Sequence, residues 1–306
     1  MAKAKSGRKP LPPWVEAVLG ALLTSVARLP LPAAHRIGQV LGWLMLGVPN
    51  KQRRNALINI RACFPELDEP AARAFRRRSL PEYGKTYLEI AYLWLRSAEQ
   101  VLGSIRDVRG VELLRREDGR GVIVLSPHLG AWELAGLYLS SLGPTTTLYK
   151  PQPVLDGLIA KARARRGALV VPITPQGIRQ LLQALRRGEY VGMLPDQEPK
   201  ADRGAVFAPF FGVPAYTMLL VSRMARKTGA RVVFLIAERL PRGGGYRIHC
   251  LPAPVGIDSE DDPTAASALN QGVESCIRIC PEQYTWPYKR FRMRPDGLQR
   301  LYRGPL

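Results

Sequence analysis

Apolar and polar residues alternate with two different periods from about residue 103 onward. Short apolar runs predict strands at residues 121–125, 145–149, 169–172, 190–194, 231–237 and 246–250. Longer stretches with helical spacing predict helices at residues 132–142, 155–166, 175–187, 217–228 and 265–280. This alternation indicates an α/β fold in which a mixed central sheet is flanked by helices.

The first hundred residues lack this alternation and predict a helical section. Two apolar stretches, at residues 14–27 and 37–48, are each shorter than the roughly 20 residues that a helix needs to cross a bilayer. Basic residues precede and follow them, which favours helices that lie along or dip into an anionic membrane surface. We therefore expect residues 1–50 to be a basic tail followed by membrane-associated helices. One short span, a cleaved signal peptide and a buried pair of core helices are the alternatives.

The overall charge adds information about partners. The chain carries 45 Lys and Arg against 25 Asp and Glu, a formal net charge of +20. Such a surplus favours polyanionic partners, which include nucleic acid, anionic lipid headgroups and acidic or phosphorylated substrates. A solvated basic surface without a partner is the alternative. The four cysteines are too few and too scattered for a disulfide framework, so we expect buried free thiols.

The first candidate for chemistry lies at the end of the strand predicted at residues 121–125. Ser126 and Pro127 break the apolar run, His128 follows, and Glu133 falls in the first turn of the next helix. A tight loop can turn the two side chains toward each other, so that the carboxylate orients the imidazole as a general base. The alternative is a structural histidine in the loop, with Glu133 favoured by the helix N-terminus.

Further polar residues follow later elements. Asp196 and Gln197 come after the strand predicted at residues 190–194, and a second strand end of the same sheet can deliver them to the same edge. Arg163 and Arg165 lie near a predicted helix C-terminus, where they either complement the helix dipole or bind phosphate or carboxylate. The segment 281–295 mixes aromatic and basic residues, as in a nucleic-acid stacking surface or an interfacial membrane belt.

One glycine- and proline-rich segment and several absent motifs complete the pattern. Residues 203–217 are expected to form an apolar loop, with Thr217 capping the helix that follows. Several other motifs are absent from the sequence: a phosphate-binding GxxxxGK[ST] loop, a GxGxxG after a strand, an HExxH pair, zinc-knuckle spacing and a GxSxG elbow. A histidine–carboxylate base without a covalent nucleophile is what remains, and it suits direct transfer to a hydroxyl.

Taken together, these residues resemble the lipid A biosynthesis acyltransferases, the lauroyl and myristoyl transferase family within the glycerolipid acyltransferase superfamily. The resemblance runs through residues 55–65, the H-x4-E motif from His128 to Glu133, residues 163–167, 194–197, 206–217 and 281–295. At the third position after His128 the chain has Ala131, where relatives often have Asn. H-x4-E alone is weak, whereas the ordered set is specific.

The resemblance implies an O-acyltransferase domain at residues 51–306. It would move a fatty acyl chain from acyl carrier protein, or coenzyme A, to a hydroxyl of a phosphorylated glycolipid at the cytoplasmic face of the inner membrane. His128 would be the base and Glu133 would orient it, without an acyl-enzyme. Arg163 or Arg165, the latter favoured, would bind phosphate or stabilise the transition state.

In this reading, Asp196 and Gln197 would support the pocket. No cofactor beyond the thioester donor and no nucleic-acid partner is expected. An acyltransferase for another membrane lipid, such as a lysophospholipid, an aminoacyl lipid or a phosphoinositide mannoside, is the near alternative. A non-catalytic basic protein that binds membranes or nucleic acid is the distant one.

Overall fold

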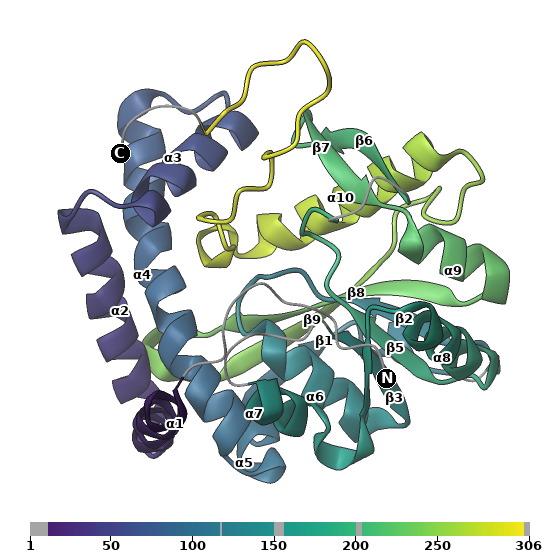
Figure 1. Ribbon diagram of the computed structural model, residues 1–306, viewed down its shortest axis with the longest axis horizontal. Coiled ribbons are helices and arrows are strands. Elements are labelled where there is room, and N and C mark those ends of the chain that lie inside the picture. The colour runs from purple at the N-terminus through teal and green to yellow at the C-terminus, as the bar shows by residue number, and fades with distance from the viewer. Residues whose placement is uncertain (1–11, 117, 150–155, 200–203, 303–306) are drawn as a thin grey trace.

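The computed structural model describes residues 12–116, 118–149, 156–199 and 204–302. The basic tail expected in the first eleven residues lies outside this part of the chain. The centre of the fold is a seven-stranded mixed sheet (Figure 1). Its strands follow one another in the order β1 (Ile105–Arg109), β9 (Tyr246–Pro252), β8 (Arg231–Arg239), β2 (Val122–Leu125), β5 (Tyr190–Met193), β3 (Thr145–Tyr149) and β4 (Leu169–Pro172).

Strands β8, β2, β5, β3 and β4 form a parallel block, whereas β9 runs antiparallel to β8 and β1 runs parallel to β9. The predicted mixed sheet is therefore confirmed. Because the block is parallel, the carboxyl ends of β2 and β5 lie at the same edge, and the loops that follow them meet there.

Helices cover both faces of the sheet, which explains why its strands read as continuous apolar runs. Val122 and Val124 belong to the core under α5 (Ala98–Leu102) and α6 (Trp132–Leu142). Ile123 and Leu125 point the other way, into the core shared with three later helices. Those helices are α8 (Pro175–Arg186), α9 (Leu220–Thr228) and α10 (Asp262–Ile279). A further helix, α7 (Asp156–Arg163), packs beside α6.

The section before the sheet is helical, as predicted. It contains α1 (Pro13–Ala27), α2 (Leu31–Gly47), α3 (Lys51–Cys63) and α4 (Glu69–Leu95). Side chains set the helix starts: Asn50 accepts a hydrogen bond from the Arg53 N–H, and Asp68 accepts one from the Ala71 N–H. Short 3₁₀ turns connect later elements at Val111–Leu114, Arg165–Gly167, Pro241–Gly243 and Pro281–Gln283.

Helices α2 and α4 lie side by side along one edge of the molecule (Figure 1). Three glycines let their backbones touch. A Cβ added to Gly38 would stand 2.5 Å from the Lys85 Cα, one on Gly42 would stand 2.3 Å from the Leu80 carbonyl oxygen, and one on Gly84 would stand 2.1 Å from the Gly38 carbonyl oxygen. At these three positions a side chain would clash with the neighbouring backbone, so glycine allows the two helices to pack closely.

The outer faces of α1 and α2 are apolar and exposed. Trp14, Val18 and Leu22 project from α1 at four-residue spacing, and α2 and its end expose Ile37, Val40, Leu41, Trp43, Leu44 and Val48. Among the described residues, no helix combines the length and the hydropathy that crossing a membrane requires.

Two local expectations were wrong. Residues 205–218 form the hairpin of β6 (Ala205–Phe210) and β7 (Val213–Met218) rather than an irregular loop. Thr217 lies within β7 and caps no helix, because α9 begins at Leu220. The hairpin is a separate two-stranded sheet, so its prolines interrupt no larger ladder.

The aromatic segment near the C-terminus is also not the exposed surface that its composition indicated. Tyr284, Trp286 and Phe291 are almost completely buried, and Trp286 packs against Phe64 and Phe75. These rings are therefore unavailable as a stacking platform or a membrane belt. The expected buried free thiols are confirmed for all four cysteines.

Candidate functional site

His128 and Asp196 meet at the carboxyl edge of the parallel block. His128 follows β2 and Asp196 follows β5, so the pairing of these two strands brings the two loops together. The Asp196 Oδ1 lies 2.8 Å from the His128 Nδ1, and the Asp196 Oδ2 accepts the His128 backbone N–H at 3.0 Å. One carboxylate thus holds both the ring and the main chain of His128. The expectation that both residues reach one edge is confirmed.

The protonation of this pair follows from the carboxylate. Burial acts to raise the pKa of Asp196, but the charge and hydrogen bonds of His128 outweigh it, and the pKa lies below its usual value. An ionised carboxylate only accepts hydrogen bonds, so the proton of the neutral ring sits on Nδ1. The other nitrogen, Nε2, then carries the lone pair. The Gln197 amide nitrogen lies 3.2 Å from it and donates to it.

The loop after His128 is fixed by segments far away in the chain. The His128 carbonyl accepts hydrogen bonds from the Thr285 hydroxyl at 2.8 Å and the Thr285 N–H at 3.1 Å. Gly130 has a φ of +58°, and a Cβ there would stand 2.2 Å from the Ala237 carbonyl oxygen. Only glycine fits this turn, which leads directly into α6.

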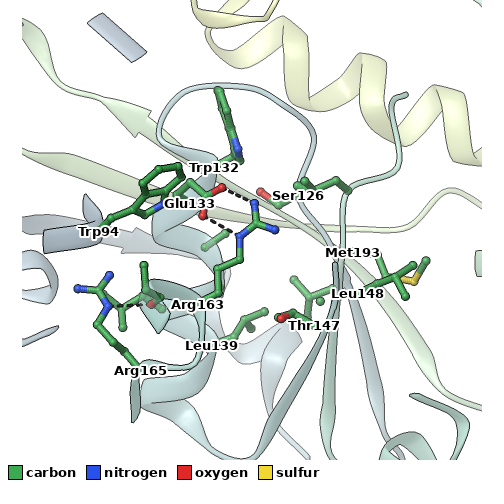
Figure 2. A pocket seen from close by; sticks show the side chains of 17 residues that line it. Trp94, Ser126, Trp132, Glu133, Leu139, Thr147, Leu148, Arg163, Arg165 and Met193 are labelled. Carbon is green, nitrogen blue, oxygen red and sulfur yellow. Dashed lines mark hydrogen bonds and ion pairs between the residues drawn. The ribbon is translucent and has the colours of Figure 1, made fainter. Parts of the chain in front are cut away.

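We expected Glu133 to contact the His128 ring, but the two side chains do not touch. Its carboxylate accepts two hydrogen bonds from the Arg163 guanidinium, one of them from Nε at 3.0 Å (Figure 2). The reason is geometric, because the helix begins at Trp132 and its first turn directs Glu133 toward α7. Burial raises the pKa of Glu133, but Arg163, Trp94 and the charge of His128 together lower it below its usual value. The histidine and Glu133 therefore interact through charge, while Asp196 makes the hydrogen bond.

The Arg165 side chain donates hydrogen bonds to main-chain carbonyls. Its Nη1 donates to the Arg96 carbonyl at 2.7 Å, its Nε donates to the Ala162 carbonyl at 2.8 Å, and its Nη2 donates to the Leu93 carbonyl. Arg165 thus joins the end of α7 to the end of α4. The anion-binding role of Arg165 stays a prediction.

An apolar cavity begins beside the histidine. Trp132, whose ring centroid lies 5.1 Å from that of His128, forms part of its wall, together with Glu133 and Arg163. From there the cavity extends between α6 and the sheet toward Leu139 and Thr147 (Figure 2). Its interior offers about 60 Å³ to the centre of a water-sized sphere. Its lining is mainly apolar, which suits a hydrocarbon chain, and it also includes the charged residues Glu133, Arg163 and Arg165.

A buried charge network supports the loop from behind. Arg239 donates to both oxygens of Glu89 at 2.8 Å and to the Gly130 carbonyl at 2.9 Å. Glu89 also bonds the Nε2 of His35, which comes from α2, at 3.1 Å. All three charged or polar side chains are at least 95% buried. The network therefore links α2 and α4 to the loop that carries His128.

This network predicts a specific acid sensitivity. Although burial raises the pKa of Glu89, Arg239 and His35 lower it to about 2, from 4.5. Because the folded pKa lies below the unfolded one, the stabilisation is complete above about pH 4.5 and is lost as the pH falls toward 2. The free energy of unfolding of the wild type, measured with a denaturant, should fall by roughly 3 kcal/mol over that interval because of this group alone. In the Glu89→Gln variant the free energy of unfolding should lack this part of its pH dependence. The control Glu66→Gln, which changes an exposed carboxylate, should keep it. An equal pH dependence of the free energy of unfolding in all three proteins would contradict this role of Glu89.

Arg239, Thr285 and Trp94 were not among the predicted site residues, although Thr285 lies in the segment 281–295 that carries part of the resemblance. Arg239 ends a strand, Thr285 follows a 3₁₀ turn, and both act through long-range contacts. Trp94, which lines the cavity, belongs to the aromatic run at residues 83–95, a pattern that indicates packing in general. Within the described residues, no cluster of three or more His, Cys, Asp or Glu side chains is placed to hold a metal ion.

Comparison with known proteins gives consistent matches. A model of the family described as bacterial lipid A biosynthesis acyltransferase matches residues 3–293. The chain is 29% identical over 294 residues to a lipid A biosynthesis lauroyltransferase of Escherichia coli strain K12, covering 94% of this chain and 95% of that protein. It is 28% identical over 283 residues to a lipid A biosynthesis acyltransferase of Haemophilus influenzae, covering 90% and 89%. A lipid A biosynthesis palmitoleoyltransferase of Escherichia coli matches at 28% over 280 residues, covering 90% of each chain.

Proposed function

Since the chain belongs to the bacterial lipid A biosynthesis acyltransferase family and is an acyltransferase, we propose that it moves a fatty acyl chain from an acyl carrier protein thioester to a hydroxyl of a phosphorylated lipid A precursor. Coenzyme A thioester is the alternative donor. The observation that carries the proposal is the His128 ring, which is held between Asp196 and Gln197 and packs beside Trp132, a residue that lines an apolar cavity.

In the proposed reaction the acceptor hydroxyl replaces the Gln197 amide as the donor to the His128 Nε2. The hydroxyl oxygen attacks the thioester carbonyl while its proton passes to Nε2. As the tetrahedral intermediate collapses, the carbon–sulfur bond breaks and His128 returns the proton to the leaving thiolate. An ester and a free thiol result. No covalent bond to the protein forms at any step.

Two carboxylates stabilise the imidazolium that forms during proton transfer. Asp196 does so through its hydrogen bond to Nδ1, and Glu133 does so through charge alone. Glu133 also fixes Arg163 at the cavity wall. No side chain caps the amino terminus of α6. We propose that Arg163 and the first N–H groups of α6 stabilise the negative charge on the thioester oxygen, and that Gln197 and Arg165 support the site.

The basic composition fits such substrates. The proposed acceptor carries phosphates, and the proposed carrier protein is acidic, so a net charge of +20 favours both encounters. The cavity beside Trp132 would take the acyl chain, because its mainly apolar walls match a hydrocarbon chain.

A direct assay tests this function. Purified protein is incubated with lauroyl acyl carrier protein and a tetra-acylated, phosphorylated glucosamine disaccharide lipid, and the products are identified by mass spectrometry. A new ester on the disaccharide lipid, with release of the carrier thiol, is the expected result. Lauroyl coenzyme A and a lysophospholipid, offered in parallel, define the donor and acceptor. Transfer to the lysophospholipid alone would overturn the acceptor, and no transfer to either lipid would overturn the function.

We also propose that the protein docks on the cytoplasmic face of the inner membrane through the outer face of α1 and α2. An exposed apolar stripe of this kind is unusual on a soluble surface. Exposed basic residues lie at its ends, namely Arg28, Arg36 and Lys51. Apolar side chains flanked by cations match the interfacial zone of an anionic bilayer.

Changing two side chains of this face should weaken membrane binding. Trp43 and Leu44 are 53% and 60% exposed, so replacing both with serine removes little packing within the protein. The loss of about 1.5–3 kcal/mol of burial for each side chain should lower binding to phosphatidylglycerol vesicles at least about tenfold. Vesicle co-sedimentation measures it. The matched control is Ile173→Ser, a 56% exposed residue away from α1 and α2, which should bind like the wild type. Wild-type binding by the double variant would exclude this face as the docking site.

A further inference from the structure

The walls of the cavity can be ordered by distance from Trp132, which lines the cavity and packs beside the His128 ring. On α6, Glu133, Gly136 and Leu139 are each three residues apart, so they succeed one another along the helix in steps of about 4.5 Å. On the sheet, Val124 of β2, Gly192 of β5 and Thr147 of β3 are paired across neighbouring strands and form one row.

This row lies next to Leu139 of α6. A Cβ on Gly192 would stand 3.1 Å from the Thr147 Cγ2 and 3.8 Å from the Leu139 Cδ1. Leu139, the last of the three α6 residues, therefore lies over the sheet row. Glu133 marks the reacting end, and Leu139 with the row marks the far end. Gly136 lies between them on the helix wall.

Gly136 has no packing reason to be glycine. It lies within α6, where glycine destabilises a helix by roughly 0.5–1 kcal/mol relative to alanine. A Cβ at this position would meet no heavy atom within 4 Å. This contrasts with Gly38, Gly42 and Gly84, where a neighbouring backbone excludes any side chain. The space beside Gly136 is the cavity itself.

We propose that Gly136 sets the length of the acyl chain that the enzyme accepts, because its missing side chain leaves open the passage from the Glu133 end of the cavity to the row of Val124, Gly192 and Thr147. This inference rests on the proposed function and names the substrate feature that the same site selects. A side chain at residue 136 would occupy the passage, so long chains would lose the far part of the cavity while short chains would still fit.

The test measures donor preference in two variants. The wild type, Gly136→Ala and Gly136→Leu are assayed with decanoyl, lauroyl, myristoyl and palmitoyl acyl carrier protein on one acceptor lipid. For Gly136→Leu, the ratio of kcat/KM for palmitoyl to that for decanoyl transfer should fall at least about tenfold relative to the wild type. Gly136→Ala should shift the ratio in the same direction but less, and it should unfold at a temperature equal to or above that of the wild type.

The matched control is Gly157→Ala. Gly157 is an exposed residue of α7, and a Cβ there also meets no heavy atom within 4 Å. Its chain-length profile should equal that of the wild type. An unchanged profile in Gly136→Leu would overturn the inference, and so would a loss of equal size for every donor, because neither depends on chain length. Both outcomes leave the wild type active, whereas a wild type that is inactive with all four donors would overturn the proposed function instead.

Discussion

Replacement of His128 with alanine is expected to lower acyl transfer by about 10²–10⁴-fold, the usual contribution of a positioned general base. The His128 Nε2 is the atom that would take the hydroxyl proton, and alanine offers no substitute for it. The ring is only partly buried and packs at its face against Trp132, so its removal should leave the fold intact. Initial rates with a saturating donor, together with the unfolding temperature, measure both effects.

A second histidine serves as the control for this variant. His249 bonds the Glu238 carboxylate at 2.8 Å, so it is also a histidine–carboxylate pair, but it lies within β9 rather than at the carboxyl edge of the parallel block. His249→Ala should change stability without a comparable loss of turnover. Turnover close to wild type in His128→Ala would remove His128 from the mechanism.

The second large effect is expected from Asp196→Asn. The asparagine has the same shape, but its amide nitrogen donates a hydrogen bond to the His128 Nδ1 and so favours the ring form with the proton on Nε2. That form cannot accept the hydroxyl proton, and the same change in the serine-protease triad lowers kcat by about 10⁴-fold. We expect a fall of about 10³–10⁴-fold in kcat here. Nitrogen chemical shifts of the ring should show the proton moving from Nδ1 to Nε2.

Glu133→Gln provides the comparison that separates the two carboxylates. Glu133 acts on the ring through charge and holds Arg163, so its loss should reduce transfer less than that of Asp196 and should leave the His128 tautomer unchanged. The opposite order of losses, or a tautomer change in Glu133→Gln alone, would assign the orienting role to Glu133.

Local patterns in the sequence predicted most of the sheet and its covering helices. The β-branched runs that form β2 and β8 are buried on both faces, and a continuous apolar run is what such strands require. The helix at residues 132–142 was predicted with its observed bounds. By contrast, β1 was not predicted, because Arg106, Asp107 and Arg109 give it the polarity of a loop, which a strand at the edge of the sheet tolerates.

The hairpin of β6 and β7 was missed for a related reason. Pro209 and Pro214 face each other across its two strands, and Gly212 lies in its turn. In a longer sheet these residues would interrupt the hydrogen bonds between strands, so the sequence pattern predicts a loop. A two-stranded hairpin has only edge strands, where proline is allowed.

In the candidate site, the sequence predicted the residues better than their pairing. The H-x4-E spacing brings Glu133 close to His128 in the chain, which favours the interpretation that the two form the hydrogen bond. The partner of the ring is instead set by strand order: β5 lies next to β2, so Asp196 arrives at the Nδ1 from 68 residues away. Strand order depends on packing of the whole domain, and spacing within one motif does not reveal it.

The contact between His35 and Glu89 has a practical consequence for handling the protein. The outer face of α2 is the one that we assign to the bilayer. His35 lies on the inner face of the same helix and completes the charge network behind Gly130. Trimming the leading helices to obtain a more soluble enzyme would remove His35 and expose the buried Glu89 carboxylate and Arg239 guanidinium that support the turn at Gly130. Exchanging the outward apolar side chains of α1 and α2 for polar ones avoids this exposure, because His35 stays in contact with Glu89.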